Sequence, residues 1–457
     1  MRLSADSIHA VPQEVPRPGY DRAAQQVGIV HFGIGAFHRA HQAWYTDACM
    51  NGGERDWMIA GVSLRSGTVA QQLDPQDGLY TLVERSGERV EARVIGAVQE
   101  VLVGGADDNA ILSHLAAPTT HIVSFTVTEK GYCRAGNGSL DLVAAREGSF
   151  YPHLARAMRE RKQAGSGGLT LLSCDNLAHN GDRLAQLMRE FLDAEAPDLV
   201  AWFDAECTCP NSMVDRIVPA ATPADLDAAQ GLLGAVRDEG AVFTEAFSQW
   251  VIEDRFAGPR PAWENHGAQL VSDVAPYETA KLRMLNGAHS LLAYAGLSRG
   301  YQFVHEAVAD PALRTLVERL MRDEAAPTIS AASGQDLGAY ADRLLARFED
   351  PALRHRLAQI AMDGSEKLPQ RWLETLAHNP QQQCTAILSG IAAWLWHLTD
   401  GRFVDDPRGS ELRALVAATP RDQLLATMFG EGGPLASRWS PSDADCRYVE
   451  NKLGELS

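Results

Sequence analysis

Val27 to His41 read VGIVHFGIGAFHRAH, and this stretch predicts the fold of the first part of the chain. Val27–Phe32 has the apolar run of a buried strand, and the residues after Gly35 open a helix. Gly33 and Gly35 occupy the first two positions of a G-x-G-x-x-G turn, where the backbone bends tightly and can approach a pyrophosphate. The third position holds His38. The stretch therefore predicts a Rossmann-like dinucleotide-binding domain with an incomplete fingerprint.

A second predicted strand, Trp57–Ser63, ends in a segment that bears on the choice of cofactor. NAD-binding folds commonly carry an Asp or Glu there, which holds the ribose hydroxyls. In this chain Leu64–Thr68 contains no acidic residue and carries Arg65. Because a guanidinium suits the 2′-phosphate of NADP, this segment leaves the choice between NAD and NADP open.

The alternation of strands and helices changes character after about residue 275. Two further apolar runs before it read as buried strands: Thr119–Thr128 and Leu169–Cys174. Later stretches have helical spacing with charged faces: Leu313–Asp323, Tyr340–Phe348 and Pro351–Met362. We therefore predict an α/β fold with a Rossmann-like NAD(P)-binding domain over residues 1–275. A mainly α-helical substrate-binding and catalytic domain is expected over 276–457, with the active site in the cleft between the two domains.

Three polar side chains fall on the apolar face of a predicted helix, Lys281–His289, that opens the second domain. At about 100° per residue, Lys281, Asn286 and His289 share one arc with leucines. Burying an amine, an amide and an imidazole is costly unless each has a partner, so the helix is expected to line a pocket. The alternative is a lysine that extends to solvent and a core Asn and His bonded to backbone.

These three groups suit the interconversion of an alcohol and a ketone. A desolvated amine can accept a proton near neutral pH, and an amide can donate to an oxygen that gains negative charge. A neutral imidazole can orient a hydroxyl. No metal is needed if a nicotinamide takes the hydride.

Two other motif interpretations are weaker. Tyr277 and Lys281 satisfy the Tyr-x-x-x-Lys pattern of short-chain dehydrogenases, but this position is too far along the chain and the glycine turn has the wrong spacing. Cys207 and Cys209 do not have a usual zinc spacing, and no second cysteine pair lies at a suitable interval. We therefore predict no metal site.

Four motifs together resemble the polyol-specific long-chain dehydrogenases, a family that includes mannitol 2-dehydrogenases, D-arabinitol dehydrogenases and hexuronate reductases. The motifs are Gly33–Gln42, Cys174–Gly181, Pro210–Arg216 and Lys281–His289. They follow one another in order over nearly the whole chain. Four ordered motifs are far more specific than a single glycine turn.

The resemblance implies roles for individual residues. Lys281 resembles the general base, and Asn176 and Asn286 resemble the amide donors that hold the reacting oxygen. Glu278, three residues before the lysine, resembles an acid that helps carry the proton to solvent, although an exposed Glu–Lys pair is the alternative. The expected substrate contacts are His289, Asp215 and Lys367.

Cofactor contacts are expected in the glycine turn and just past strand ends, where open α/β sheets bind ligands. They are Gly33, Gly35, Ala36, Phe37, His38, Arg65 and Thr128. One position departs from the family pattern, because Gln359 stands where mannitol-type members carry an Arg before the substrate-binding lysine. The identity of the substrate is therefore left open.

Composition agrees with a globular cytoplasmic enzyme. The chain has 457 residues, of which 45% are hydrophobic, and its seven cysteines lack the dense spacing of a disulfide framework. A net charge of -18 argues against binding to nucleic acid or to an anionic membrane. The N-terminus lacks an apolar signal core, and the most apolar late stretch, Leu388–Leu398, suits a buried helix. A monomer or weak oligomer is expected.

The predicted function is the metal-independent oxidation of a secondary alcohol of an open-chain polyol to the ketose, and the reverse, with NAD favoured over NADP. Mannitol, D-arabinitol and sorbitol are the expected types of substrate. One alternative is a hexuronate reductase acting on fructuronate or tagaturonate, which needs a cation for the substrate carboxylate, from Lys367 or from an arginine outside the motifs. Another is a nonenzymatic nucleotide-sensing protein, which the presence of Lys281, Asn176 and Asn286 disfavours.

Overall fold

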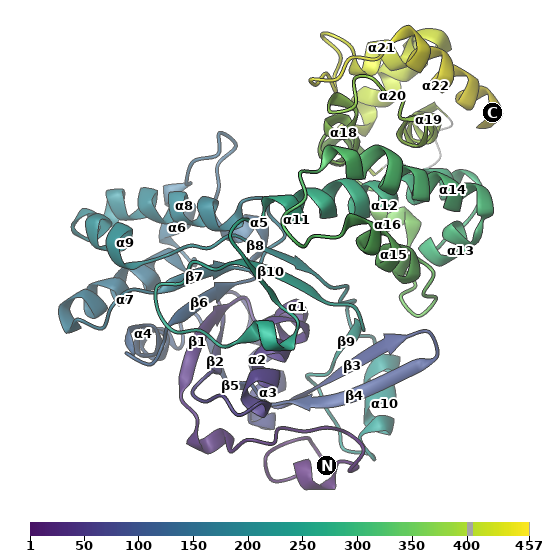
Figure 1. Cartoon of the computed structure of the whole chain (residues 1–457). Helices are drawn as coiled ribbons and strands as arrows, with labels where there is room; N and C mark the ends of the chain where they lie inside the picture. Colours follow the sequence, from purple (N-terminus) through teal and green to yellow (C-terminus); the bar gives the residue numbers. More distant parts are fainter. Residues whose placement is uncertain (400–404, 457) are drawn as a thin grey trace. The chain divides into compact units, whose positions relative to one another are not determined.

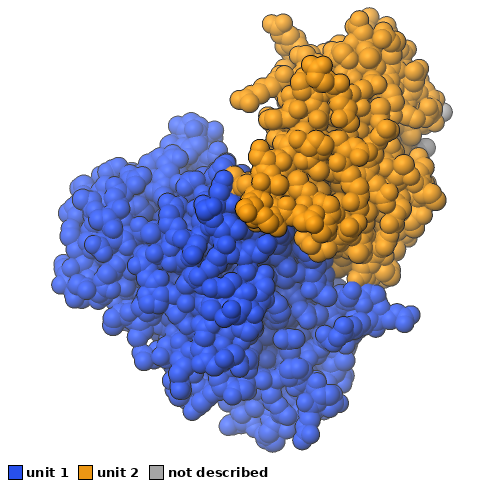
Figure 2. All heavy atoms as spheres, viewed as in Figure 1, with its two compact units in different colours: residues 1–274 blue, residues 275–457 orange. Residues whose placement is uncertain are grey.

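The computed structural model describes residues 1–399 and 405–456. The chain divides into two compact units, Met1–Val274 and Ala275–Ser457 (Figure 2). The first unit contains parallel strands and helices, and the second is helical (Figure 1). The predicted fold class is confirmed.

A five-stranded sheet forms the centre of the first unit, with strand order β5-β2-β1-β6-β7. Its strands are β1 (Val27–Phe32), β2 (Met58–Ser63), β5 (Val98–Val103), β6 (Ile122–Phe125) and β7 (Thr170–Ser173). All of its pairings are parallel. Every residue of β1, β6 and β7 is buried, which explains why these strands are nearly continuous apolar runs in the sequence.

The order of the strands brings their carboxyl ends to one edge. Phe32 at the end of β1 pairs with Val62 of β2 and with Phe125 of β6, and Phe125 pairs in turn with Ser173 of β7. The chain leaves β1 in one direction towards β2 and β5 and later returns on its other side as β6 and β7. Such a reversal of strand order is where open α/β sheets bind ligands.

Helices connect and cover the strands of this unit (Figure 1). They are α1 (Ala36–Ala40), α2 (Gln42–Asn51), α3 (Thr68–Leu73), α4 (Asp108–Ala116), α5 (Thr128–Gly131), α6 (Leu142–Arg146), α7 (Tyr151–Ala164), α8 (Asn180–Glu195), α9 (Val200–Glu206) and α10 (Pro223–Leu232). Short 3-10 turns lie at Ile8–Ala10, Arg22–Ala24, Asp74–Gln76, Pro197–Leu199 and Trp263–His266. Helix α4 packs against α7, and α8 packs against β7.

Two smaller sheets complete the first unit, and the sequence interpretation did not include them. One has the order β11-β10-β8, from β8 (Ser212–Asp215), β10 (Gln249–Glu253) and β11 (Gln269–Val271). The other has the order β4-β3-β9, from β3 (Tyr80–Ser86), β4 (Arg89–Ile95) and β9 (Val242–Glu245). Strand β9 pairs with β3 across more than 150 residues of sequence, so no local pattern could reveal this pairing.

The second unit contains no β-strand in the part that the structure describes. Its α-helices are α11 (Ala275–Ala280), α12 (Gly287–Ser298), α13 (Val304–Ala309), α14 (Pro311–Arg319), α15 (Leu337–Phe348), α16 (Leu357–Ile360), α17 (Gly364–Leu368), α18 (Glu374–Ala377), α19 (Thr385–Thr399), α20 (Gly409–Ala418), α21 (Leu424–Phe429) and α22 (Asp443–Leu456). Short 3-10 turns lie at Ala326–Thr328 and Arg421–Gln423. Three segments are π-helices: Lys281–Asn286, Leu320–Ala325 and Pro369–Leu373. The predicted buried helix around Leu388–Leu398 is confirmed as α19, which packs against α12 and α22.

Among the described residues, no helix combines the length and apolar character that a bilayer crossing requires.

Two helix predictions in this unit are wrong in detail. Within Pro351–Met362 only Leu357–Ile360 is helical, because the backbone next to it bonds to another segment: Val304 N donates to His355 O, and Leu357 N donates to Gln302 O. The spacing of 100° per residue also fails over Lys281–Asn286, which is a π-helix.

Candidate functional site

The turn after β1 requires glycine at its first position. Gly33 has φ +94°, and a Cβ atom added there would lie 2.2 Å from the carbonyl oxygen of Thr126. Its N–H donates to Val62 O at 2.8 Å, so the turn is held against both neighbouring strands. Gly35 differs, because its φ is -85° and an added Cβ would meet no atom nearer than 3.8 Å.

A cavity of about 620 Å³ opens at this turn. It lies where the segments after β1 (33–35), β2 (63–66) and β6 (126–127 and 130–131) come together, and residues from 141–149 close one side. This is the edge of the sheet where the strand order reverses, which is the usual ligand position in open α/β folds.

The walls of the cavity combine apolar and charged groups. Leu64, Val69, Val127 and Val143 supply apolar surface, and the Val143 side chain is 73% exposed. Such exposure is unusual for a valine and leaves apolar surface free to cover a planar ring. Arg65 supplies a cation just after β2. A flat base, a ribose and an anionic phosphate chain are the parts of a dinucleotide, and this wall offers surface for each.

The cavity includes only some of the residues that the sequence predicts to contact a cofactor. Gly33, Gly35 and Arg65 line it. Thr128 borders a neighbouring hollow of about 610 Å³ and has φ +64°. The remaining members of that prediction lie at the start of α1 and do not line the cavity: Ala36, Phe37 and His38.

The structure contradicts a direct contact between His38 and a cofactor phosphate. The His38 side chain is fully buried, and its ring stacks on that of His31 with the centroids 3.4 Å apart. Burial lowers the pKa of His38 well below its ordinary value. His38 lies at the start of a helix, as predicted, but its side chain points towards β1 and not towards the cavity.

A buried hydrogen-bond network supports the glycine turn from inside the unit. The two ring nitrogens of His31 each lie 2.8 Å from a hydroxyl, Nδ1 from Ser124 Oγ and Nε2 from Thr126 Oγ1. Thr126 Oγ1 donates to Gly33 O at 2.7 Å, and Ser124 Oγ lies 2.7 Å from the side-chain amide of Gln42. Sequence reasoning missed this network, because its partners are up to 95 residues apart.

His31 is expected to make the stability of the protein depend on acid. Burial lowers its pKa from 6.5 to about 3, so as pH falls below 6.5 the unfolded chain takes up a proton that the folded chain does not. The stability that the neutral ring confers is present above pH 6.5 and is lost as pH falls towards 3. The loss is at most about 1.4 kcal/mol per pH unit.

Urea unfolding of wild type and His31→Gln at pH 7, 6 and 5 tests this expectation. The variant should be less stable at pH 7, and its free energy of unfolding should fall less steeply with acid. The matched change His9→Gln, at an exposed position, should leave the dependence of the free energy of unfolding on pH as in wild type. If the free energy of unfolding fell equally with pH in wild type and His31→Gln, His31 would not be the source of the acid dependence.

Gly33→Ala and Gly35→Ala form a matched pair that separates folding from cofactor binding. Alanine at Gly33 meets Thr126 O at 2.2 Å and must adopt a positive φ, so unfolding should become easier by about 2 kcal/mol or more. Alanine at Gly35 fits the backbone, but its methyl group projects at the cavity wall. We expect Gly35→Ala to unfold like wild type and to bind NADH at least about tenfold more weakly, as measured by fluorescence titration. If Gly35→Ala and wild type bound NADH with equal affinity, this cavity would not be the cofactor-binding site.

The candidate amide Asn176 lies in the turn after β7, next to an aspartate that fixes this turn to its neighbour. The Asp175 carboxylate accepts hydrogen bonds from Val127 N at 3.0 Å, Thr128 N at 2.9 Å and Tyr132 Oη at 2.8 Å. Burial raises the pKa of Asp175 despite these bonds. Asn176 itself is exposed, so its amide is accessible to a ligand.

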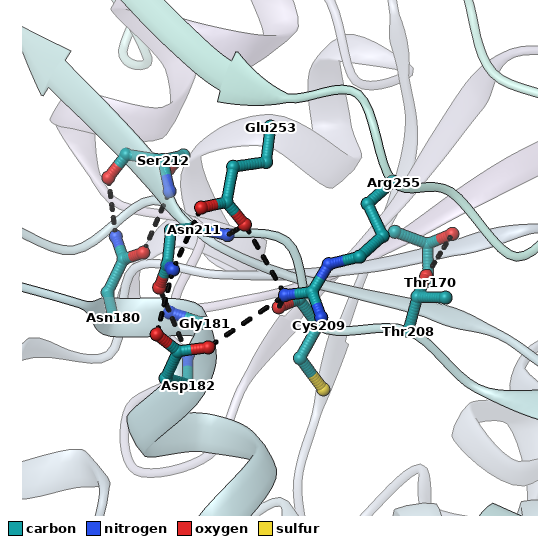
Figure 3. A network of polar contacts seen from close by, with 10 residues as sticks. All are labelled: Thr170, Asn180, Gly181, Asp182, Thr208, Cys209, Asn211, Ser212, Glu253 and Arg255. Carbon is teal, nitrogen blue, oxygen red and sulfur yellow. Dashed lines mark hydrogen bonds and ion pairs between the residues drawn. The ribbon is translucent and has the colours of Figure 1, made fainter. Parts of the chain in front are cut away.

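Asn180, at the start of α8, joins this turn to strand β8 (Figure 3). Its Nδ2 group donates to the carbonyl oxygens of Ser173, Asp175 and Ser212 at 3.2, 3.1 and 2.9 Å. Its Oδ1 accepts from Ser212 N at 2.9 Å. A fully buried amide with this set of bonds fixes the position of the backbone that carries Asn176.

Asn211, just before β8, holds the first turn of α8 in the same region (Figure 3). Its Oδ1 accepts from Gly181 N and Asp182 N at 2.9 and 3.1 Å, in the first turn of α8. Its Nδ2 donates to Asp182 and to Glu253 at 3.0 and 3.1 Å. Strand β8 begins at the next residue and ends at Asp215, which is buried, so the two asparagines place the segments of Asn176 and Asp215 side by side.

In the second unit, Lys281 is the first residue of a π-helix and is 9% exposed. Glu278, in the preceding helix α11, is also buried, which argues against an exposed Glu–Lys pair. Asn286 ends the π-helix and is half-buried. The expected burial of Lys281 is observed, and π-helical segments are frequent at functional sites.

His289 lies in the first turn of α12 and is buried against two rings. The centroid of Phe348 is 4.8 Å away and that of His355 is 5.1 Å away. Burial lowers the pKa of His289 well below its ordinary value, and the positive groups nearby lower it further. The imidazole is therefore neutral, the form that can orient a hydroxyl.

Lys367 lies on α17 and is half-buried. Its Nζ donates to Met362 O at 2.7 Å and lies 3.4 Å from the Asp363 carboxylate. Burial lowers its pKa, and the charge of Arg371 adds to the effect. Gln359, on α16, is exposed.

No group of three His, Cys, Asp or Glu side chains within 1–399 and 405–456 is arranged to hold a metal ion. Cys207 and Cys209 are both free thiols.

Comparisons with known proteins match both units. The model of the mannitol dehydrogenase Rossmann domain matches residues 27–265, and the model of the mannitol dehydrogenase C-terminal domain matches residues 273–428. D-mannonate oxidoreductase of Escherichia coli (strain K12) is 40% identical over 454 residues, which cover 94% of this chain and 93% of that protein.

Two solved structures are similar over nearly the whole chain. Mannitol 2-dehydrogenase of Pseudomonas fluorescens, in a ternary complex with NAD and D-mannitol, has a TM-score of 0.81 and 34% identity and covers 100% of this chain and 97% of its own. Substrate-free D-sorbitol dehydrogenase has a TM-score of 0.90 and 31% identity, covering 99% and 96%. The predicted resemblance is confirmed, and the chain belongs to the mannitol dehydrogenase family.

Proposed function

We propose that the chain is a metal-independent dehydrogenase that uses NAD to oxidise a secondary alcohol of an open-chain polyol to the ketose, and that also catalyses the reverse reaction. The observation that carries this proposal is the match of both units to the mannitol dehydrogenase family over almost the whole chain. Mannitol, D-arabinitol and sorbitol are the candidate substrates, since the similar structures are of a mannitol 2-dehydrogenase bound to D-mannitol and of a D-sorbitol dehydrogenase.

Residues 1–275 are proposed as the nucleotide-binding domain. The cavity at the glycine turn supports this assignment, because Gly33 and Gly35 leave backbone exposed where a pyrophosphate can approach. Arg65 and Thr128 are proposed to contact the cofactor as well, with Ala36 and Phe37 at the start of α1. We propose that His38 acts from the interior, by packing on His31, and makes no cofactor contact. The bound nicotinamide supplies the hydride acceptor.

Residues 276–457 are proposed as the substrate-binding and catalytic domain. Lys281 would take the hydroxyl proton, since a desolvated amine is a base near neutral pH. Glu278 is proposed to help pass this proton on, and its burial supports this role. Asn286, together with Asn176 of the first domain, is proposed to donate to the oxygen as it gains negative charge.

Substrate hydroxyls are proposed to bind His289, Asp215 and Lys367. The neutral state of the His289 ring supports this role, because a neutral imidazole can both donate and accept a hydrogen bond. Exposed Gln359 offers no positive charge at its position.

A spectrophotometric screen tests the proposal. Mannitol, D-arabinitol and sorbitol would be offered with NAD and with NADP over a range of pH, and fructose with the reduced cofactors. We expect NAD-dependent oxidation of at least one polyol, unchanged after treatment with a chelator. NADH binding without turnover of any polyol or sugar acid would favour a nonenzymatic nucleotide-sensing protein.

One second candidate is favoured by a specific finding. The relative named D-mannonate oxidoreductase acts, by its name, on a sugar acid. A hexuronate reductase would have the same fold and the same base, and it would differ in needing a cation for the substrate carboxylate.

The chain is further proposed to be a cytoplasmic monomer or weak oligomer. The net charge of -18 supports this state, because like charges oppose association. Light scattering after size-exclusion chromatography measures the mass directly.

A further inference from the structure

A second histidine, His355, faces the proposed substrate contact His289 inside the second unit. The centroids of the two rings are 5.1 Å apart, and the ring planes meet at 82°. His289 lies on α12, and His355 lies two residues before α16, which packs against α12 (Figure 1). The fold therefore brings together two imidazoles that are far apart in the sequence.

The backbone that carries His355 is fixed by hydrogen bonds on both sides of the ring. Val304 N donates to His355 O at 3.0 Å, and Leu357 N donates to Gln302 O at 3.0 Å. Sequence reasoning missed this histidine, because it expected residues 351–362 to form one helix. The observed segment holds the ring in place without the help of a ligand, as a preorganised binding site requires.

The two arginines beside His355 lie on a different ring. The guanidinium carbons of Arg354 and Arg356 are 5.3 and 6.0 Å from the centroid of Phe303. His355, between them, contacts His289 instead. The face that His355 shares with His289 is therefore separate from the Phe303 contact that these two charges make.

Nitrogen atoms of this histidine pair have hydrogen-bonding capacity that the protein does not use. His355 Nδ1 is buried and has no hydrogen bond to a described residue. His289 makes ring contacts with Phe348 and His355, and it forms no hydrogen bond within residues 1–399 and 405–456. A buried nitrogen without a partner is costly, so this pair favours a ligand that can bond to it.

The charge state of the pair selects the kind of ligand. Burial lowers the pKa of His355 from 6.5 to about 4, and the charge of Arg347 adds to the effect. Burial also lowers the pKa of His289 well below its ordinary value. Each ring is therefore neutral near neutral pH, with one donor and one acceptor nitrogen. A hydroxyl, which both donates and accepts, suits two such rings better than an anion, which only accepts.

We propose that His355, together with His289, binds two neighbouring hydroxyl groups of the open-chain substrate, which makes His355 a further substrate-binding residue that selects for a hydroxyl at its position. This inference rests on the proposed dehydrogenase function and adds a residue to its substrate site. The nearly perpendicular rings support it, because nitrogens in two different planes can serve two different hydroxyls.

The test measures KM and kcat for the NAD-dependent oxidation of D-mannitol, D-arabinitol and sorbitol. In His355→Phe, which keeps a ring and removes both nitrogens, KM for the best of these polyols should rise roughly tenfold, while kcat stays within about twofold of wild type. His355→Asn places an amide near the position of Nδ1 and should recover most of the affinity. His378→Phe changes an exposed histidine of the same unit and should leave KM as in wild type.

Substrates that lack one hydroxyl identify the contact directly. Among the monodeoxy analogues of the best polyol, wild type should lose about tenfold in kcat/KM for the analogue that lacks the hydroxyl bound by His355. His355→Phe should lose less than about twofold with the same analogue, because its contact to that hydroxyl is already absent.

The outcomes separate this inference from the proposed function. Equal KM in wild type and His355→Phe, or equal losses with every deoxy analogue, overturns the role of His355 and leaves the dehydrogenase proposal intact. A fall in both kcat and the free energy of unfolding, shared by His355→Phe and His355→Asn, assigns His355 to folding and also overturns its role. If His355→Phe does not fold, His355→Ala replaces it in the same comparisons. No turnover of any polyol by wild type overturns both proposals.

Discussion

Lys281→Ala is expected to lower kcat/KM by roughly 10³-fold while leaving the affinity for NADH nearly unchanged. Without the amine, no group at that position accepts the hydroxyl proton as hydride leaves the carbon. The cavity proposed to bind the cofactor is lined by residues between Gly33 and Ser149, so removal of a side chain from the second unit leaves its walls intact. Steady-state kinetics and fluorescence titration with NADH measure the two quantities separately.

The control is Lys452→Ala, which removes an amine that pairs with Glu455 on α22. It should leave kcat/KM within about twofold of wild type. A second readout distinguishes a base from a structural lysine, because a small primary amine added to the solution should restore part of the activity of Lys281→Ala. Turnover comparable to wild type in Lys281→Ala would remove the lysine from the mechanism.

The turn after β1 shows what the sequence could predict. Apart from His31, Val27–Phe32 has no polar side chain, because β1 is the central strand and is covered on both faces; this burial can be recognised from the composition of the segment. Gly33 can be recognised from the sequence as well, because its positive φ and the 2.2 Å distance from an added Cβ to Thr126 O exclude any side chain. A position whose local backbone geometry or burial allows only one kind of residue can therefore be predicted from the sequence alone.

The support behind that turn could not be predicted. His31 lies between Val30 and Phe32 in the strand, and nothing in the neighbouring sequence indicates that its two ring nitrogens contact the hydroxyl groups of Ser124 and Thr126. Asn180 and Asn211 lie within motifs that mark the family, but their roles depend on pairings 30 or more residues apart. Polar side chains that bond across the fold carry no periodic signal.

The π-helix at Lys281 is a further case in which tertiary contacts decide the geometry. Its sequence, Lys-Leu-Arg-Met-Leu-Asn, is typical of an ordinary α-helix. The segment packs against the other two π-helices, Leu320–Ala325 and Pro369–Leu373. Trp372 Nε1 donates to Gly287 O at 3.1 Å, and Arg283 Nη1 donates to Thr328 O at 2.9 Å. These distant partners contact the π-helix and the residue after it, and the π-helix turns by less than the 100° per residue that the sequence prediction assumed.

Asn286→Ala is the second change with a large expected effect. If its amide donates to the oxygen that becomes negative, its loss raises the barrier by about 2.7–4 kcal/mol, or roughly 10²–10³-fold in kcat. KM should change much less, because the bond strengthens as charge develops. Asn286→Asp is a useful companion, since it keeps the shape and replaces the donor with a negative charge, and it should be at least as slow. A loss below tenfold in Asn286→Ala would assign this residue a structural role.

The double variant Asn176→Ala/Asn286→Ala tests whether the two amides act on the same oxygen. Two donors to one developing charge are coupled, so their combined loss should differ from the sum of the single losses by more than about 0.5 kcal/mol in barrier height. Independent roles would give simple additivity. Asn180→Ala provides the comparison, because it loosens the turn that carries Asn176 without removing that amide. Its effect should therefore largely disappear once Asn176 is already alanine, and an undiminished effect would mean that Asn180 serves folding alone.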